Sequence, residues 1–219
     1  ISTNRMMMMK KLFLLILSAF FMFSFWSCTT EVTIKENSNG IINISFSGAA
    51  GQAFAKMISS SSDYQSDTVI FETEQIQFEL LKSGFENVDV KSKTGSDLQI
   101  SMQEKTKNTF LYKSGLFSGK ENLKITLSPK ELTEFYKLAD EQIILFLDLL
   151  LAPIFNDEVM SQEEYLETIA SFYGESASKE ISESNIKINL TDKNNQTKTF
   201  SFPIAQLLTL QETIILENK

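Results

Sequence analysis

The sequence VTIKENSNGIINISF, residues 32–46, alternates apolar and polar side chains on both sides of Asn39-Gly40. Alternation with a period of two residues is typical of a β-strand with one buried face. Asn-Gly between two such runs is the strongest short-range signal for a hairpin, because both central positions of a type I′ turn require positive φ. We therefore predict a β-hairpin with a type I′ turn in this part of the chain.

Several segments downstream show the same alternation. Residues 88–90 and 98–102 alternate on either side of Thr94-Gly95-Ser96, which predicts a second hairpin. Four more short apolar runs predict strands, which cover residues 123–127, 186–190, 200–202 and 214–216.

Helix signals separate these strands. Ser128 with Glu131 and Ser161 with Glu164 form capping boxes that mark the starts of two helices. The predicted helices cover residues 49–58, the second half of 69–83, 129–151, 161–173 and 203–208. The 161–173 helix is expected to present an apolar face made of Tyr165, Ile169, Phe172 and Tyr173. The polar segments are interpreted as connections, namely 59–66, 106–120 and 175–184.

The order of these elements indicates the fold class. A strand, a helical region and a hairpin occur twice, once over residues 41–105 and once over 122–202. The two halves share this order but no residue motif. The doubled β-α-β-β pattern predicts an α+β fold in which helices pack on one face of an antiparallel sheet. Residues 32–219 are expected to form a single domain with a hydrophobic core.

The first residues carry a different signal. Lys10 and Lys11 precede an apolar run over residues 12–26, and Ser27-Cys28 follows it. A positive segment, a short apolar segment and a small residue before the cleavage point are the parts of a secretory signal peptide. A membrane-spanning helix needs about 20 apolar residues, and this run is shorter. We predict a signal peptide over residues 1–27, with residues 1–5 as an extension upstream of the translation start.

The segment Phe25-Trp26-Ser27-Cys28 resembles the lipobox of bacterial lipoprotein precursors. Ser27 matches the small residue before the cut in that family, whereas Phe25 and Trp26 stand where the family prefers Leu and a small residue. The resemblance implies that the sulfur of Cys28 is acylated, that a peptidase cuts before it, and that residues 28–31 form a lipidated tether. An ordinary secretory signal with an incidental cysteine and a retained membrane helix are the alternatives.

The same resemblance implies a place in the bacterial envelope. Two or three acyl chains hold a protein durably, because each buried methylene contributes about 0.8 kcal/mol. Thr29 stands where the family carries Asp for retention in the inner membrane, which favours the outer membrane over the cytoplasmic membrane in a host that has both. Cys28 is the only cysteine in the sequence, so no intrachain disulfide is possible.

Charge and composition argue against several partner and enzyme classes. Residues 1–27 hold three basic and no acidic side chains, so the chain without them carries a net charge of −11. Such a surface repels the phosphates of nucleic acids and anionic lipid headgroups. The sequence contains no histidine and no glycine-rich phosphate motif, so we expect no catalytic triad, cofactor or metal site. The acidic pairs Asp157-Glu158 and Glu163-Glu164 are interpreted as solvated or helix-capping residues.

The segment IILFLDLLLAPIF, residues 143–155, is the stretch most suited to a binding function. From Ile144 onward its helix is apolar on every side, because Ile144, Leu145 and Leu149 occupy the face that is polar in the preceding turns. A helix that is apolar all round must be covered all round. It is either a central core helix, or Ile144, Leu145 and Leu149 form a surface for an apolar ligand or a partner.

A second resemblance covers residues 28–105. A cysteine followed at once by a hairpin, then by helices and the alternating strands of 88–102, is similar to the opening of mycobacterial LppM-type lipoproteins. Those are α+β lipoproteins with a proposed lipid-binding role, and the likeness is one of pattern that transfers no functional residue.

Together these signals predict a lipid-anchored, non-enzymatic bacterial envelope protein that acts as an interaction or binding module. The alternative is a carrier of lipid or another apolar ligand, with a cleft near residues 143–155. An unrecognised hydrolase that uses carboxylates is the third hypothesis.

Overall fold

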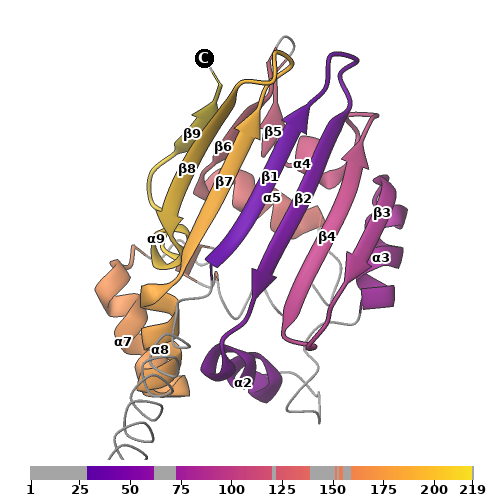
Figure 1. Ribbon diagram of the computed structural model, residues 1–219. Helices are drawn as coiled ribbons and strands as arrows, with labels where there is room; N and C mark the ends of the chain where they lie inside the picture. Colours follow the sequence, from indigo (N-terminus) through magenta and orange to yellow (C-terminus); the bar gives the residue numbers. More distant parts are fainter. Residues whose placement is uncertain are drawn as a thin grey trace, which may run out of the picture.

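A computed structural model of the chain describes residues 29–61, 73–119, 122–138, 151, 153–154 and 159–218. A large sheet and a small sheet make up its β-structure (Figure 1). The large sheet contains β1 (Thr29–Glu36), β2 (Ile42–Ala49), β3 (Glu86–Lys91), β4 (Asp97–Glu104), β7 (Asn185–Thr191) and β8 (Thr197–Pro203). The small sheet contains β5 (Phe117–Ser118), β6 (Lys124–Leu127) and β9 (Ile214–Glu217). The helices are α2 (Gln52–Ser61), α3 (Thr73–Lys82), α4 (Phe110–Lys113), α5 (Pro129–Leu138), α7 (Gln162–Tyr173), α8 (Glu175–Glu183) and α9 (Ile204–Leu208).

The six strands of the large sheet have the order β3-β4-β2-β1-β7-β8. Neighbouring strands are antiparallel except for β1 and β7, which run parallel from the pair Thr29–Asn185 to the pair Lys35–Thr191. Both predicted hairpins are present, as β1–β2 and β3–β4. The predicted α+β class with a largely antiparallel sheet is therefore confirmed.

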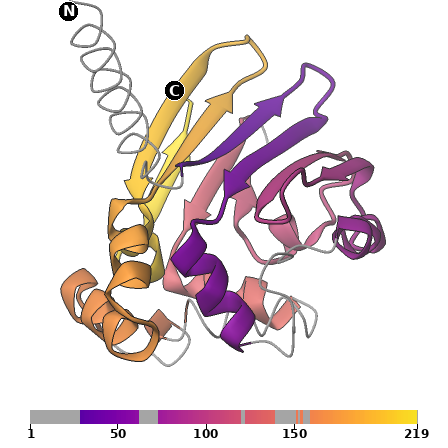
Figure 2. The ribbon, with the colours of Figure 1, turned by 60° about the horizontal axis from the view of Figure 1, so that its bottom comes forward.

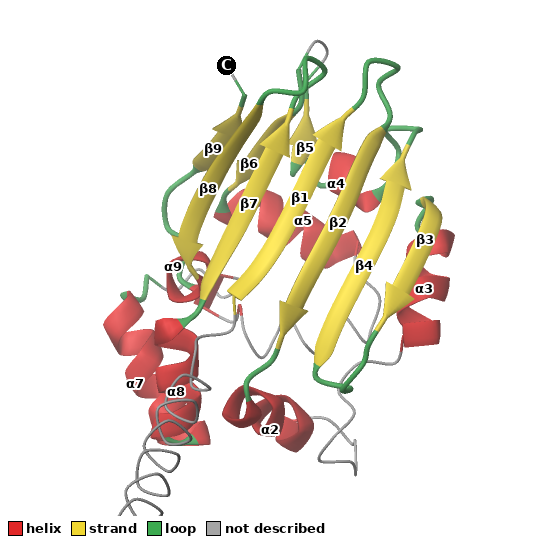
Figure 3. Ribbon diagram, in the orientation of Figure 1, coloured by secondary structure: helices red, strands yellow, loops and turns green. Residues whose placement is uncertain are grey.

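Only one face of the large sheet is covered by the described elements. Helices α4 and α5 and the three-stranded sheet β5-β6-β9 lie behind it in Figures 1 and 3. The strand–helix–hairpin order does recur along the chain, as β2 to β4 and as β6 to β8. However, β6 joins β5 and β9 in the small sheet, whereas β7 and β8 belong to the large one.

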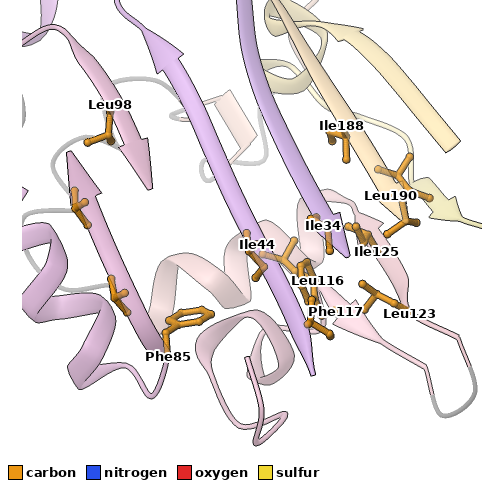
Figure 4. Packing of buried hydrophobic residues seen from close by; sticks show 14 residues of the cluster. Ile34, Ile44, Phe85, Leu98, Leu116, Phe117, Leu123, Ile125, Ile188 and Leu190 are labelled. Carbon is orange, nitrogen blue, oxygen red and sulfur yellow. The ribbon is translucent and has the colours of Figure 1, made fainter. Parts of the chain in front are cut away.

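The main hydrophobic core lies between the two sheets. Alternate side chains of the large sheet point into it, among them Ile34 of β1, Ile44 of β2 and Leu190 of β7, and Leu116 and Ile125 come from the opposite side (Figure 4). All of these side chains are buried. Since each buried Ile or Leu contributes about 1.5–3 kcal/mol, this core holds the two sheets together.

A second hydrophobic cluster lies at the lower end of the large sheet in Figure 1, among α2, α7, α8 and α9, and Figure 2 shows the same end turned forward. Its buried residues are Met57, Leu151, Ile154, Tyr165, Ile169, Ala177, Ile181, Ala205, Leu208 and Leu210. This cluster packs a group of helices against the end of the sheet where β1 and β7 begin.

The turn between β1 and β2 differs from the predicted type I′ turn. The last strand pair is Glu36 with Ile42, so the turn has more than two residues. Gly40 has a φ of 81°, whereas Asn39 does not have positive φ, and the Gly40 amide donates to the Asn37 carbonyl at 2.9 Å. This arrangement is a type I turn followed by a glycine in the left-handed region, which also matches the twist of a hairpin.

Two segments interpreted as connections form regular structure. Residues 175–183 are helix α8, whose only apolar side chains, Ala177 and Ile181, are four residues apart and both buried. The serines and charged residues around them concealed this short apolar stripe. The segment 106–120 contains α4 and β5, and its Leu116 and Phe117 are buried in the main core.

The predicted tether is also corrected. Residues 29–31 belong to β1, where Thr29 pairs with Asn185 and Thr30 with Ile186 of the parallel strand β7. The pairing uses backbone groups, so it does not need the apolar side chains on which the prediction depended. Within the described residues, the large sheet therefore includes the chain from Thr29 onward.

The expected apolar face of the 161–173 helix is correct only in part. Tyr165 and Ile169 are buried in the second cluster, but Phe172 is 77% exposed. Helix α7 ends at Gly174, as predicted, and Tyr173 in its last turn is partly buried against the same cluster, so Phe172 is the one residue of the predicted face that points to solvent.

The second predicted capping box is complete, whereas the first shows the cap bond from the Glu131 amide and a bond between the two side chains. In the first, the Ser128 hydroxyl donates to the Glu131 carboxylate, and the Glu131 amide donates to Ser128 Oγ at 3.4 Å. In the second, the Ser161 amide donates to Glu164 Oε2 at 2.8 Å and the Glu164 amide donates to Ser161 Oγ at 3.2 Å. Hydrogen bonds from Ser161 hold the pKa of Glu164 below its usual range.

We expect Ser161→Ala to lower the free energy of unfolding by about 1 kcal/mol at neutral pH, because one amide at the helix start loses its acceptor. The loss should shrink in acid, since a carboxyl whose folded-state pKa is lowered stops contributing once it is protonated. Urea unfolding measures both effects. Ser171→Ala, an exposed change later in the same helix, is the control, and an equal loss in the two variants would contradict the capping role.

Candidate functional site

The residues predicted to carry function lie outside the described residues. Cys28 is the position immediately before β1, and Ile144, Leu145 and Leu149 lie between α5 and Leu151. What the structure describes is their immediate surroundings. Strand β1 limits where a lipid on Cys28 would be, and Leu151 and Ile154 show how part of the 143–155 segment packs.

The end of the 143–155 segment is part of the protein core. Leu151 is 9% exposed and Ile154 is 5% exposed, and both belong to the second hydrophobic cluster. Leu138, the last residue of α5, is 46% exposed. The apolar character of Leu151 and Ile154 is thus explained by packing in the second cluster, without a ligand.

The start of β1 fixes the position of any group on Cys28. Thr29 is already paired with Asn185, and consecutive Cα atoms are about 3.8 Å apart across a trans peptide bond. A lipid on Cys28 would therefore attach directly to the central part of the large sheet, at the end where the helices of the second cluster gather. No flexible linker would separate the lipid from the folded domain.

The face of the large sheet opposite the main core is polar throughout its central part, and no described helix or strand covers it (Figure 3). We call this set of outward-pointing side chains the polar face. Its residues are Glu31, Thr33, Lys35, Asn43, Ser45, Ser47, Asp89, Lys91, Gln99, Ser101, Gln103, Lys187, Asn189, Thr199 and Ser201. A sheet with one solvated face normally has polar side chains there.

Short neutral side chains dominate the middle of the polar face. One row of paired residues crosses all six strands, in the order Asp89, Ser101, Ser45, Thr33, Asn189 and Thr199. Serine and threonine project only a short distance from the backbone, so the middle of this surface is nearly flat. Long charged side chains such as Lys35, Lys91 and Lys187 flank the row.

Cross-strand hydrogen bonds order both sides of the polar face. Asn189 Nδ2 donates to Glu31 Oε1 at 2.5 Å, and Thr199 Oγ1 donates to Asn189 Oδ1 at 2.8 Å. On the other side, Gln103 Nε2 donates to Asn43 Oδ1 at 2.9 Å and Asn87 Nδ2 donates to Gln103 Oε1 at 2.6 Å. These bonds hold long side chains in one conformation, so less side-chain conformational entropy would be lost when a partner binds.

Two buried carboxylates at the upper end of the sheet in Figure 1 were not predicted from the sequence. Glu36 and Glu104 flank Ile42 in the strand register, and both are buried. Glu104 accepts hydrogen bonds from the amides of Thr106, at 2.8 Å, and Lys107, at 2.6 Å. Glu36 accepts from the Leu123 amide at 3.0 Å, and its other oxygen lies 3.4 Å from Lys193 Nζ.

The groups around Glu36 and Glu104 give both carboxylates a structural role. Burial, with the negative charges of Glu36 and Glu104, raises the pKa of Tyr112 to about 12, so this phenol stays protonated. Glu104 accepts backbone amides at both oxygens, and Glu36 accepts one amide and pairs with Lys193, so both acids are engaged in contacts within the fold. Glu36 and Glu104 therefore fasten the loops that follow β4 and precede β6.

A hollow between α7 and α8 is open widely to solvent. It is lined by Glu163, Leu166, Glu167, Ala170, Ser171, Glu175 and Ser178. Ligand sites are typically enclosed and mostly apolar, and this surface is neither. In the described part of the chain, no three side chains of the His, Cys, Asp and Glu types are placed to share a metal ion.

None of the described helices is both long enough and apolar enough to cross a membrane. The chain matches no known protein family, no curated protein and no solved structure.

Proposed function

We propose that this chain is a lipid-anchored, non-enzymatic protein of the bacterial envelope, whose α+β domain binds a protein partner through the polar face. Acylation of Cys28 holds it to the membrane, and the outer membrane is the destination in a host with two membranes. The main observation behind this proposal is that the strand next to the anchoring position also contributes side chains to the polar face. The central strand β1 begins at Thr29 and contributes Glu31, Thr33 and Lys35 to the polar face.

The size of the polar face supports a protein partner. Six strands at about 4.8 Å spacing and five residues at about 3.3 Å rise give roughly 480 Å² before the rim is added. A standard protein interface buries about 800 Å² on each partner, so the face and its rim are of suitable size. The three lysines and two acids of the set nearly balance, which favours a neutral partner surface over nucleic acid or another polyanion.

The residues of the polar face also distinguish between ligand classes. The set contains no aromatic or aliphatic side chain, so it has no platform on which a sugar ring or an acyl chain would pack. It is instead rich in hydrogen-bond donors and acceptors that are aligned across strands. A partner with exposed backbone and short polar side chains satisfies these groups best.

Photo-crosslinking in the host tests this function. A photoreactive amino acid at position 45 is expected to yield a discrete protein adduct on intact membranes. Ser101 pairs with Ser45 in the central row, so Ser101→Arg should reduce that adduct at least about tenfold, because the long charged side chain prevents close approach of the partner. Ser38→Arg, in the turn between β1 and β2, is the matched control and should leave the adduct unchanged.

The outcome that would contradict an interaction module is equally specific. Adducts that survive Ser101→Arg, or that form equally from a photoreactive residue at Ser38, would show that the polar face is only solvated. Recovery of lipid in place of a protein adduct after irradiation would support the carrier hypothesis instead.

A further inference from the structure

We propose that the end of the α7–α8 hairpin, residues 171–175, is a second membrane contact that enters the headgroup layer of the bilayer beside the lipid on Cys28. This inference rests on the proposed lipid anchor and adds to it an orientation and a partner surface, which is the membrane interface. It follows from the place of the hairpin in the fold and from the exposed aromatic residue at its end.

The hairpin starts next to the anchoring point. Helix α8 runs directly into β7, whose first residue, Asn185, pairs with Thr29. The junction is fixed, because the Ile204 amide donates to the Ser184 carbonyl at 2.9 Å. The base of the hairpin and the residue that follows Cys28 are therefore neighbours in the sheet.

The hairpin extends away from the sheet on the side of the anchor. In both Figure 1 and Figure 2, α8 continues beyond the end of the sheet where β1 and β7 begin, and α7 lies beside it. Nine helical residues span about 13 Å, so the connection at Gly174 lies up to about that far from the start of β7. Phe172 is two residues from this connection and thus close to the far end.

The hairpin is rigid enough to hold this position. Ser178 Oγ of α8 donates to the Leu166 carbonyl of α7 at 2.8 Å, and Ala177 and Ile181 are buried between the helices of the second cluster. Glu180 Oε1 accepts from the Ala53 amide at 3.0 Å, which ties α8 to the first turn of α2. The hairpin therefore moves with the domain.

A lipid on Cys28 brings the hairpin end to the bilayer. The sulfur of Cys28 lies within about 6 Å of the Thr29 Cα, given one peptide unit and a short side chain. The headgroup layer of one leaflet is about 5–7 Å thick. Since the connection at Gly174 lies within about 13 Å of the same strand end, and the sulfur within about 6 Å of it, the tip is close enough to meet the headgroup layer when the acyl chains are inserted.

The chemistry of the tip suits this location. Phe172 is 77% exposed, and its ring lies 6.5 Å from the ring of Tyr173. Aromatic side chains favour the interface between water and hydrocarbon. Glu163 and Glu164 belong to the first turn of α7, at the opposite end of that helix, whereas the exposed Glu175 lies within the tip, so the contact suits zwitterionic headgroups better than anionic ones.

Tryptophan fluorescence of the intact lipoprotein tests this placement. Trp26 is the only tryptophan of the sequence, and it is removed with the signal peptide, so Phe172→Trp introduces a single reporter. The lipidated variant is reconstituted in phosphatidylcholine vesicles with and without brominated acyl chains. We expect the tryptophan at position 172 to emit at a shorter wavelength in vesicles than in detergent-free buffer. Brominated lipid should quench this emission about twofold, as for an indole at the membrane interface.

Phe78→Trp is the matched control. Phe78 is 61% exposed on α3, which lies beside the edge strand β3. The tryptophan introduced there should emit like a solvated indole, and brominated lipid should not quench it. If the protein floats with the vesicles but Phe172→Trp behaves like Phe78→Trp, the membrane contact of the hairpin is wrong while the anchor stands. If the lipidated fraction itself does not form and the protein does not float, both proposals are overturned.

Discussion

Cys28→Ala is expected to move the protein from the membrane fraction to the soluble fraction and to abolish incorporation of a labelled fatty acid. Each acyl chain contributes about 0.8 kcal/mol per buried methylene, and at least two chains are needed for durable retention. Without them, the exposed Phe172 side chain at the hairpin end is too small an apolar group to retain the acidic domain at the membrane. Membrane-bound protein should therefore fall by about a hundredfold or more.

Detergent phase partition of whole cells, with fatty-acid labelling, measures this effect. Ser24→Ala, which changes the apolar run without touching the cysteine, is the control and should leave labelling and partition intact. If Cys28→Ala stayed in the detergent phase, the N-terminal segment would be a retained membrane helix. If neither form entered the detergent phase, the chain would be secreted without lipid.

The second large effect concerns stability. Glu104→Ala should lower the free energy of unfolding by roughly 3 kcal/mol, because the buried Thr109 amide loses its acceptor and the loop amides of Thr106 and Lys107 lose theirs. Glu104→Gln should cost less, since an amide oxygen still accepts hydrogen bonds, although its NH₂ group then faces a donor. Urea unfolding of the purified protein, followed by circular dichroism, provides the comparison.

Ser101→Ala is the control for this stability measurement. Ser101 lies in the same strand as Glu104 but on the polar face, and it is exposed, so its change should stay within about 0.5 kcal/mol. Equal losses for Glu104→Ala and Ser101→Ala would mean that the loop after β4 does not depend on the buried carboxylate.

The strands and capped helices of this fold were predictable because their signals are local. Alternation identified the β1–β2 and β3–β4 hairpins, and the Ser161–Glu164 box placed the start of α7 correctly. The parallel pairing of β1 with β7 was not predictable, because no short-range pattern joins Thr29 to Asn185. That pairing also converts the expected tether into the first residues of the sheet.

Other features escaped prediction for different physical reasons. Helix α8 buries only Ala177 and Ile181, so most of its sequence shows the polarity of a loop. Buried Glu36 and Glu104 resemble solvated acids until the amides that they accept are placed beside them. Of the candidate site, the position of Cys28 was predicted from a local motif, and it remains a prediction.

The polar face could have been found by considering the polar half of each alternating strand. In residues 43–47 and 99–103 these positions hold Asn, Ser and Gln, with no charged side chain among them. A merely solvated face is often richer in Lys and Glu. What the sequence does not supply is the strand order, and only that order joins these residues into a continuous surface.

The proposed anchor depends on the chemistry of one sulfur atom, that of Cys28, and intact mass measurement of the membrane-extracted protein tests it. We predict a polypeptide that begins at Cys28 and carries the added mass of a diacylglyceryl group on its first residue. A mass that corresponds to the unmodified chain, whether or not residues 1–27 have been removed, would contradict the anchor and the orientation derived from it.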